Sequence, residues 1–351
     1  MPPSSVGARS RIAAVHPISA TEGGRITVEG THLTSQGKQL PEVRLGGQCA
    51  HVVRASAQLL SVIVPPGLEG DHTPVRVSGA VGETAFLNVG VTVATGLHQV
   101  DNPVIDSDGT LYLTYSGARG EQAPVSVFRV QRDGFREPFL SGIPNATSMT
   151  FSPDGRLYVS SRFEGTVYRV APDGSFEILV SELGIACGLA FSPDGTLYVG
   201  DRSGTVFRVG TAGHAIPFAT LPASVAAFHL AWGPDDALYV TSPTLSTYDR
   251  VYRVDHTGKI DEICSCFGRP QGLAFDRHGR LYVAEALAGA SGIYRVESNG
   301  SAVRVLAAGA IVGLAFDPTD ESLVVVSNDT AYRTTLSAAS NVSSREGRPL
   351  S

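Results

Sequence analysis

The chain has 351 residues, of which 42% are hydrophobic, and its 27 Lys and Arg against 33 Asp and Glu give a net charge of −6. This acidic balance argues against a nucleic-acid-binding protein, which needs a basic face for phosphate, and the hydrophobic content argues against a disordered chain. The 39 Gly and 21 Pro predict frequent turns, and the absence of long stretches of 3.6-residue period excludes a helical bundle.

The two ends of the chain, residues 1–10 and 338–351, are rich in Ser, Pro and Arg and are predicted to be flexible tails. The N-terminal residues lack the unbroken apolar core of a secretory signal. We therefore expect a cytoplasmic protein, or an extracellular one if a signal was removed. No run of about 18 apolar residues is present, which predicts that the chain does not insert into a membrane.

Residues 11–90 contain short alternating strands broken by Gly23-Gly24, Gly46-Gly47 and Pro65-Pro66. This pattern is typical of a small β-sandwich. The four cysteines of the chain are too few and too irregularly spaced for a disulfide framework. Cys264 and Cys266 either belong to a metal or redox site or are two small residues on one face of a strand.

The most informative feature is a motif that recurs six times between residues 103 and 333. Its clearest copy is GLAFSPDGTLYVGD at 188–201, and residues 272–285 match it closely. The second position of the LYV unit marks the copies, which lie 40 to 46 residues apart: Tyr112, Tyr158, Tyr198, Tyr239, Tyr282 and Val324. This is the period of propeller blades.

Each copy reads as four strands, which we call a to d. The GLAF run predicts strand a, a tight turn follows, LYV predicts strand b, an aromatic-Arg pair such as Tyr168-Arg169 marks strand c, and an outer strand d comes next. The sixth pair, Tyr332-Arg333, is followed by a poor outer strand, whereas Val91–Leu97 is a spare strand before the first copy. A ring with free edges is prone to aggregation, so we expect residues 91–97 to complete the sixth blade of a propeller that spans residues 91–337.

Two resemblances accompany these patterns. Ile12, Val15 and Pro17, the run Gly23-Gly24-Arg-Ile-Thr-Val-Glu-Gly30, and Pro65-Pro66-Gly67 resemble the immunoglobulin-like IPT/TIG domain over about 80 residues. The six copies resemble six-bladed propellers of the NHL-repeat and gluconolactonase-like group over about 240 residues. The fold expected is thus all-β, an immunoglobulin-like sandwich followed by a six-bladed propeller.

Propeller geometry places the start of each strand a and the end of each strand b at one face, around the central channel. Polar side chains at these positions are expected to share that mouth. We assign His229, Arg202, Asp201 and Glu285 as candidate catalytic residues, and Asn102, Tyr115, Arg162 and Gln271 as candidate ligand-binding residues.

Several of these residues also have structural interpretations. His229 replaces the repeat glycine and is either a general acid or base or a hydrogen-bonded core residue. Asp201 either serves the site or caps the adjacent turn. Arg162 and Arg202 either bind an anion or are solvated. The arginine of the six aromatic-Arg pairs is expected to be architectural, paired with backbone carbonyls or with an acid of a neighbouring blade.

The gluconolactonase-like resemblance implies a divalent metal on the propeller axis, held by an acid, an Asn and an Asp. The corresponding positions here are Asp101, Cys187 and Gln271. A hard cation prefers carboxylate oxygens, whereas Cys is a poor ligand for it and Gln is neutral. We therefore predict no metal and no cofactor at these residues.

Two functions follow as expectations. The first is a gluconolactonase-like protein that acts on a small polar or anionic molecule at the mouth, as a lactone or ester hydrolase or a lyase. No nucleophile motif such as G-x-S-x-G is present to support it. The second is a non-catalytic propeller that binds a small ligand or a protein partner, with the N-terminal domain as a spacer.

Overall fold

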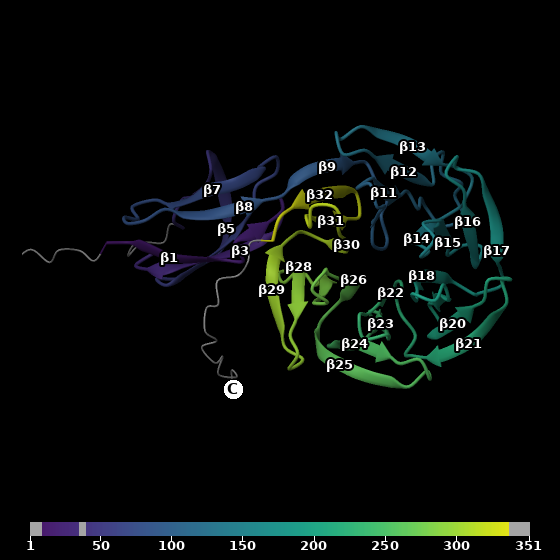
Figure 1. Cartoon of the computed structure of the whole chain (residues 1–351). Coiled ribbons are helices and arrows are strands. Elements are labelled where there is room, and N and C mark those ends of the chain that lie inside the picture. The colour runs from purple at the N-terminus through teal and green to yellow at the C-terminus, as the bar shows by residue number, and fades with distance from the viewer. Residues whose placement is uncertain (1–8, 35–39, 337–351) are drawn as a thin grey trace, which may run out of the picture.

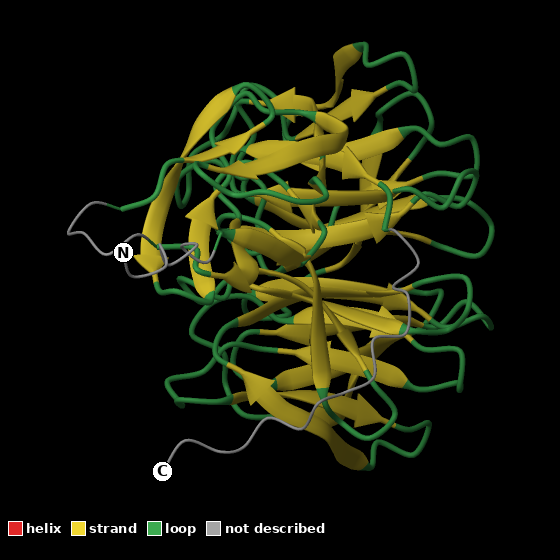
Figure 2. Ribbon diagram, turned by 90° about the vertical axis from the view of Figure 1, so that its left-hand side faces the viewer, coloured by secondary structure: helices red, strands yellow, loops and turns green. Residues whose placement is uncertain are grey.

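The computed structural model describes residues 9–34 and 40–336, and every regular element in them is a β-strand (Figure 2). No helix in these residues is long or apolar enough to cross a membrane. The predicted tails, residues 1–10 and 338–351, fall outside the described residues except for residues 9 and 10.

The N-terminal strands form one continuous hydrogen-bonded arrangement rather than two separate sheets. Their order is β1-β3-β6-β5-β4-β7-β8-β2, in which β5 pairs with both β4 and β6. The apolar sides of these strands share one core. The predicted immunoglobulin-like sandwich is therefore not shown, because β5 joins what would be its two sheets. The strands are β1 (Arg11–His16), β2 (Ser19–Ala20), β3 (Arg25–Thr31), β4 (Val43–Leu45), β5 (Gln48–Ala55), β6 (Leu59–Ile63), β7 (Gly70–Val77) and β8 (Ala85–Val89).

The remaining strands form a β-propeller whose blades surround a central axis (Figure 1). Five blades are separate four-stranded sheets. Four of them follow chain order: β10 (Val104–Ile105), β11 (Leu111–Thr114), β12 (Val127–Val130) and β13 (Arg136–Leu140); β14 (Ala146–Phe151), β15 (Leu157–Ser161), β16 (Thr166–Val170) and β17 (Phe176–Val180); β18 (Ala186–Phe191), β19 (Leu197–Asp201), β20 (Thr205–Val209) and β21 (Ala215–Thr220); β22 (His229–Trp232), β23 (Leu238–Thr241), β24 (Asp249–Val254) and β25 (Ile260–Phe267).

The fifth separate blade takes its outer strand from the other end of the sequence. Its order is β30 (Ile311–Phe316), β31 (Leu323–Ser327), β32 (Thr330–Thr334) and β9 (Val91–Thr95). Ala331 pairs with Ala94 and Arg333 with Val91. Within residues 91–97, the segment expected to complete the last repeat, Val91–Thr95 pairs with β32, so β32 is not an edge strand.

The number of separate blades differs from the six that the repeats predict. The fifth repeat forms β26 (Pro270–Phe275), β27 (Leu281–Glu285), β28 (Gly292–Val296) and β29 (Ala302–Ala307), in the same meander order as the other blades. The outer strand β29 also pairs in parallel with β2 through Ala20 and Ala307, and this joins the unit to the N-terminal strands in one twelve-stranded sheet.

One aromatic contact recurs at the seams between consecutive four-stranded units. The Tyr of each LYV strand packs against the aromatic residue that ends strand a of the next unit, with ring centroids 4.9 to 5.5 Å apart. Such aromatic pairs contribute beyond their buried area. The five pairs are Tyr112–Phe151, Tyr158–Phe191, Tyr198–Trp232, Tyr239–Phe275 and Tyr282–Phe316.

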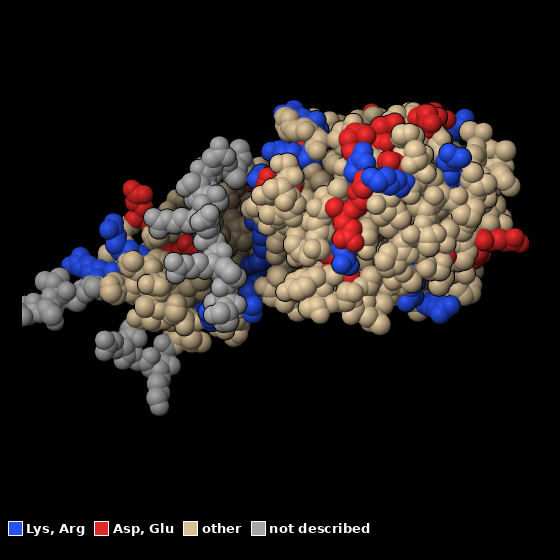
Figure 3. Space-filling model, turned by 90° about the horizontal axis from the view of Figure 1, so that it is seen from below, with Lys and Arg blue, Asp and Glu red and all other residues tan. Residues whose placement is uncertain are grey.

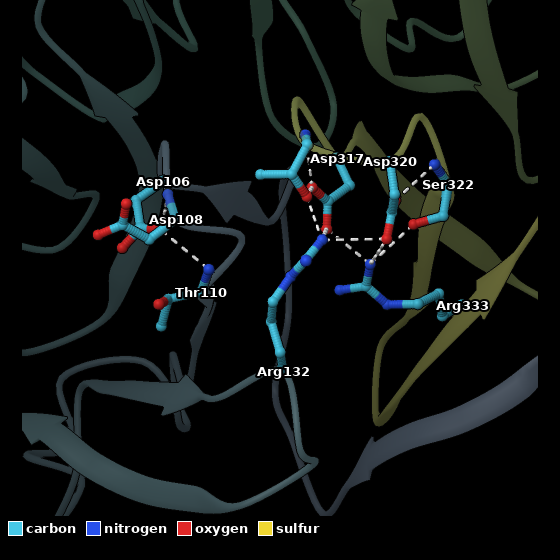
Figure 4. Close-up of polar contacts among 9 residues, drawn as sticks. Asp106, Asp108, Thr110, Arg132, Asp317, Asp320, Ser322 and Arg333 are labelled. Carbon is cyan, nitrogen blue, oxygen red and sulfur yellow. Dashed lines mark hydrogen bonds and ion pairs between the residues drawn. The ribbon is translucent and has the colours of Figure 1, made fainter.

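The seam between the last unit and the first has Val324 in place of the Tyr and carries charged contacts in addition. In Figure 4, Arg132, from the turn before β13, points toward Asp317 and Asp320. Arg333 of β32 contacts the buried carboxylate of Asp317 at 2.6 Å. Asp106 fixes the neighbouring turn by accepting the backbone N–H of Asp108 and Thr110.

This buried carboxylate makes stability depend on pH. Burial acts to raise the pKa of Asp317, but hydrogen bonds from Arg333 and Thr319 outweigh it and hold the pKa below its usual value. A lowered native pKa stabilises the fold above about pH 4, and this contribution is lost as the pH falls through the native pKa. We expect Asp317→Asn to lower the unfolding free energy by about 2 kcal/mol at pH 7 and by much less at pH 3, measured by urea unfolding. An equal loss at both pH values would contradict this assignment.

The repeated arginine pairs mainly within its own blade, which corrects the expectation of partners in neighbouring blades. Arg129 and Arg169 contact the acids of their outer strands, Glu137 and Glu177, because strands c and d are hydrogen-bonded neighbours. Arg253 contacts Asp235 of its own a–b turn. Figure 3 views the propeller from the side of β25, where acidic and basic side chains lie beside one another.

Candidate functional site

A cavity of about 370 Å³ opens at the face where the strand b to c and strand d to a connections meet. The residues that line it lie in strand b to c connections, in strand d to a connections, and at the starts of the inner strands. The lining residues are Gln99, Val100, Arg119, Arg162, Phe163, Ile185, Cys187, Arg202, Val225, Ala226, Ala227, Gln271, Val312 and Asn328. We call this space the mouth cavity.

Three arginines supply the charge of the mouth cavity, and no Asp or Glu is among its lining residues. Arg162 is partly buried at the end of β15 and has no hydrogen bond or salt bridge within the described part of the chain. Burial, together with the nearby Arg202 and Arg119, lowers the pKa of the Arg162 guanidinium. An unpaired, partly desolvated cation with like charges beside it is stabilised by an anion.

Arg202 is more constrained than Arg162. Its Nε and Nη2 donate to the backbone carbonyls of Ser224 and Val225, at 3.2 and 2.9 Å. These bonds tie Arg202 to the 221–228 connection, and three of its five guanidinium N–H donors remain for a ligand. Arg119 lies on the 115–127 connection of the first blade.

Of the two buried amides in the lining, Gln99 and Gln271, one has an unused donor. Gln99 donates to the carbonyl of Asp101 and accepts the N–H of Thr114, so it is committed to the scaffold. Gln271 is only 6% exposed, and its Nε2 has no hydrogen-bond partner among the described residues. A buried amide donor without a partner costs free energy, so Gln271 marks a place where a ligand acceptor is missing.

His229 lies outside the lining of the mouth cavity. Its side chain is 0% exposed, and its Nδ1 lies 2.6 Å from Oδ1 of Asp101. The two residues belong to the first and fourth units along the chain, so the contact crosses the propeller axis. Val100 lines the mouth cavity and Asp101 lines a second, axial cavity of about 390 Å³, so this segment separates the two spaces.

Asn102 also acts within the scaffold. Its Nδ2 donates to the carbonyl of Leu273 in β26, and its Oδ1 accepts the N–H of Leu314 in β30. A Cβ at Gly272 would approach Asn102 Oδ1 to 2.0 Å, and a Cβ at Gly313 would approach its Cα to 2.7 Å. The repeat glycines thus leave room at the axis that the Asn102 side chain occupies.

Asp201 and Glu285 have the same role in different blades. Asp201 accepts the N–H of Ile185, and Glu285 accepts the N–H groups of Gly268 and Leu287 at 2.7 Å. Both carboxylates end strand b and satisfy the backbone of neighbouring connections, so neither reaches the mouth cavity. Tyr115 is also outside the lining, and its ring contacts His98 and Phe128.

The structure therefore brings Arg162, Arg202 and Gln271 together in one cavity and leaves the other candidate residues outside it. Sequence reasoning missed Arg119 and the apolar wall around Phe163. Phe163 directly follows Arg162, and its position in the strand b to c connection was the available signal. Arg119 lies on a long connection that has no counterpart in the other repeats, so aligning the repeats could not place it.

The metal implied by the gluconolactonase-like resemblance does not fit these residues. Asp101 is occupied by His229 and by the N–H of Asn102. Burial raises the pKa of the Cys187 thiol to about 12, so this side chain is neutral. Within residues 9–34 and 40–336, no three His, Cys, Asp or Glu side chains gather to hold a metal ion.

Comparisons with known proteins show the fold. No family model and no curated protein sequence matches the chain. An auxiliary nutrient binding protein from Bacteroides thetaiotaomicron is similar in structure (TM-score 0.57, 15% identity, 94% of this chain and 99% of that one). So are a gluconolactonase from Xanthomonas campestris (TM-score 0.56, 17% identity, 69% and 88%) and an inactive virginiamycin B lyase from Staphylococcus aureus (TM-score 0.52, 15% identity, 94% and 97%). The chain thus shares the propeller fold of both enzymes and binding proteins.

Proposed function

We propose that the protein binds a small organic anion in the mouth cavity. The observation that carries this proposal is one cavity lined both by the guanidinium of Arg162 and by the amide of Gln271, whose donors have no partner among the described residues, and by no carboxylate. Arginine forms bidentate hydrogen bonds with carboxylate and phosphate groups. A volume of about 370 Å³ is within the range of small-molecule sites.

The residues of the mouth cavity fit ligand binding better than catalysis. The one thiol in the lining, Cys187, is neutral because burial raises its pKa to about 12, and a neutral thiol is a weak nucleophile. His229 is fully buried outside the cavity lining, with its Nδ1 bonded to Asp101. The Bacteroides neighbour, named as a nutrient binding protein, is in line with a binding role.

A lactone or ester hydrolase or a lyase is the second candidate function, which the names of the Xanthomonas and Staphylococcus neighbours favour. In that case His229 and Arg202 would act on the ligand, with Asp201 and Glu285 in support. Turnover of a panel of lactones and esters, with and without a chelator, separates the two functions.

We also propose the number of blades and the domain boundaries. We assign the fifth repeat, β26–β29, as a propeller blade in addition to the five separate ones, because it makes the recurrent seam contact with both neighbours, Tyr239–Phe275 and Tyr282–Phe316. Residues 11–90 are proposed as an IPT/TIG-like domain and residues 91–337 as the propeller.

If the proposal is correct, the substitution Arg162→Gln lowers the affinity for small anions. We expect it to weaken the binding of small carboxylates at least about tenfold, because a charge-assisted hydrogen bond contributes roughly 1.5–3 kcal/mol. Ligand-observed NMR titration with gluconate, 3-phenylpropionate and inorganic phosphate measures this effect. Arg156→Gln is the matched control, because Arg156 is exposed on the turn between β14 and β15 at the opposite face. Equal losses in both variants, or none in either, would refute the proposal.

A further inference from the structure

More than half of the side chains that line the mouth cavity are apolar or neutral, and an inorganic anion would make no favourable contact with them. Eight of its lining side chains carry no charge or amide, and they lie beside the arginines: Val100, Phe163, Ile185, Cys187, Val225, Ala226, Ala227 and Val312. Phe163 is 52% exposed. A large aromatic side chain exposed in a cavity wall gains free energy when a ligand covers it.

The connection next to the cavity wall also carries exposed apolar side chains. The N–H of Val225 and the hydroxyl of Ser224 both donate to the carbonyl of Pro243. This fixes the 242–248 connection beside the cavity wall. The same connection carries Leu245, which is 92% exposed, and the exposed Tyr248. Exposed apolar side chains therefore lie on a connection that is hydrogen-bonded to the cavity wall.

Charged donors and apolar side chains thus line the same cavity. Arg162 and Gln271 offer donors to an anionic group. Phe163 and the 225–227 segment offer a surface for an apolar group. A polyhydroxylated sugar acid would leave its hydroxyl groups facing this wall without partners, and such desolvation is unfavourable.

We infer that the ligand is an amphipathic organic anion, with one carboxylate or comparable group toward Arg162 and an aromatic or branched apolar body against Phe163. This inference rests on the proposed function, since it specifies the chemistry of the ligand in the same cavity. Such a site would prefer an anion with an apolar body over a sugar acid.

Four probes test the two halves of the ligand in the full-length protein by ligand-observed NMR titration. The probes are 3-phenylpropionate, propionate without the ring, 3-phenylpropan-1-ol without the charge, and gluconate with a polar body. We expect 3-phenylpropionate to bind at least about tenfold more tightly than each of the other three. Phe163→Ala should weaken 3-phenylpropionate several-fold and leave propionate unchanged.

The matched control for Phe163 is Phe135→Ala, because Phe135 is also more than half exposed, at 61%, in the turn between β12 and β13 at the opposite face. It should change neither affinity. Arg162-dependent binding of gluconate as tight as that of 3-phenylpropionate would overturn this inference and leave the proposed function standing. Equal affinity for the alcohol, or binding of every carboxylate that is insensitive to Arg162→Gln, would overturn both. An unchanged affinity of Phe163→Ala for 3-phenylpropionate would overturn the assignment of the apolar body to this wall.

Discussion

Replacing Ala94 by Asp is expected to unfold the propeller, or to lower its unfolding free energy by several kcal/mol. Ala94 lies on the closing strand β9, and its side chain is buried among Leu111, Val324 and Ala331 at the seam between the last and first units. A carboxylate placed there has no partner and loses its hydration. Thermal unfolding monitored by circular dichroism measures the effect.

Val91→Asp on the same strand is the matched control. Val91 is largely exposed, so this change should cost less than about 1 kcal/mol. Deletions give a second measurement, because removal of residues 1–97 takes away β9 whereas removal of residues 1–88 keeps it. The longer deletion should abolish cooperative unfolding and the shorter should retain it. Similar behaviour of the two deletions would show that β9 does not hold the ring closed.

His229→Ala is expected to lower the unfolding free energy by about 3 kcal/mol while leaving ligand binding within about twofold of the wild-type value. The substitution removes the imidazole that faces Asp101 and leaves a buried carboxylate with fewer partners and a cavity at the axis. Urea unfolding and titration with 3-phenylpropionate measure the two quantities. His256→Ala, at an exposed turn, should change neither.

The opposite result, unchanged stability with lost activity, would give His229 a catalytic role. If His229→Ala keeps the wild-type stability but abolishes turnover of a lactone or ester, the residue is catalytic and the second candidate function is correct. His229→Gln adds a further distinction, because a glutamine amide can still donate to Asp101. It should recover part of the stability if the role of His229 is structural.

The repeated elements could be predicted because each blade is a local unit. Strands a to d follow one another in sequence, and their pairing depends on a turn and an alternating pattern that recur within 40 to 46 residues. The closing strand could also be predicted, since a missing outer strand at one end and a spare strand at the other indicate the same pairing.

The N-terminal organisation could not be predicted in the same way. β5 pairs with β4 through residues 48–50 and with β6 through residues 51–55, and these pairings depend on strands elsewhere in the sequence rather than on the residues of β5 itself. The pairing of β2 with β29 joins residues that are far apart in the sequence, and only two residues of β2 take part. A pairing this short between distant segments cannot be predicted from the local sequence pattern.

The sequence alone determined which polar residues stand at the strand ends that face the mouth, because the repeat aligns these positions. Only the tertiary structure decided which of them are free to bind. Asp201 and Glu285 accept backbone N–H groups of neighbouring connections. His229 is fully buried and is bonded through its Nδ1 alone to Asp101 across the axis, whereas Arg162 has no partner among the described residues. A side chain's position follows from its place in the repeat, whereas its availability depends on partners that other blades bring to it.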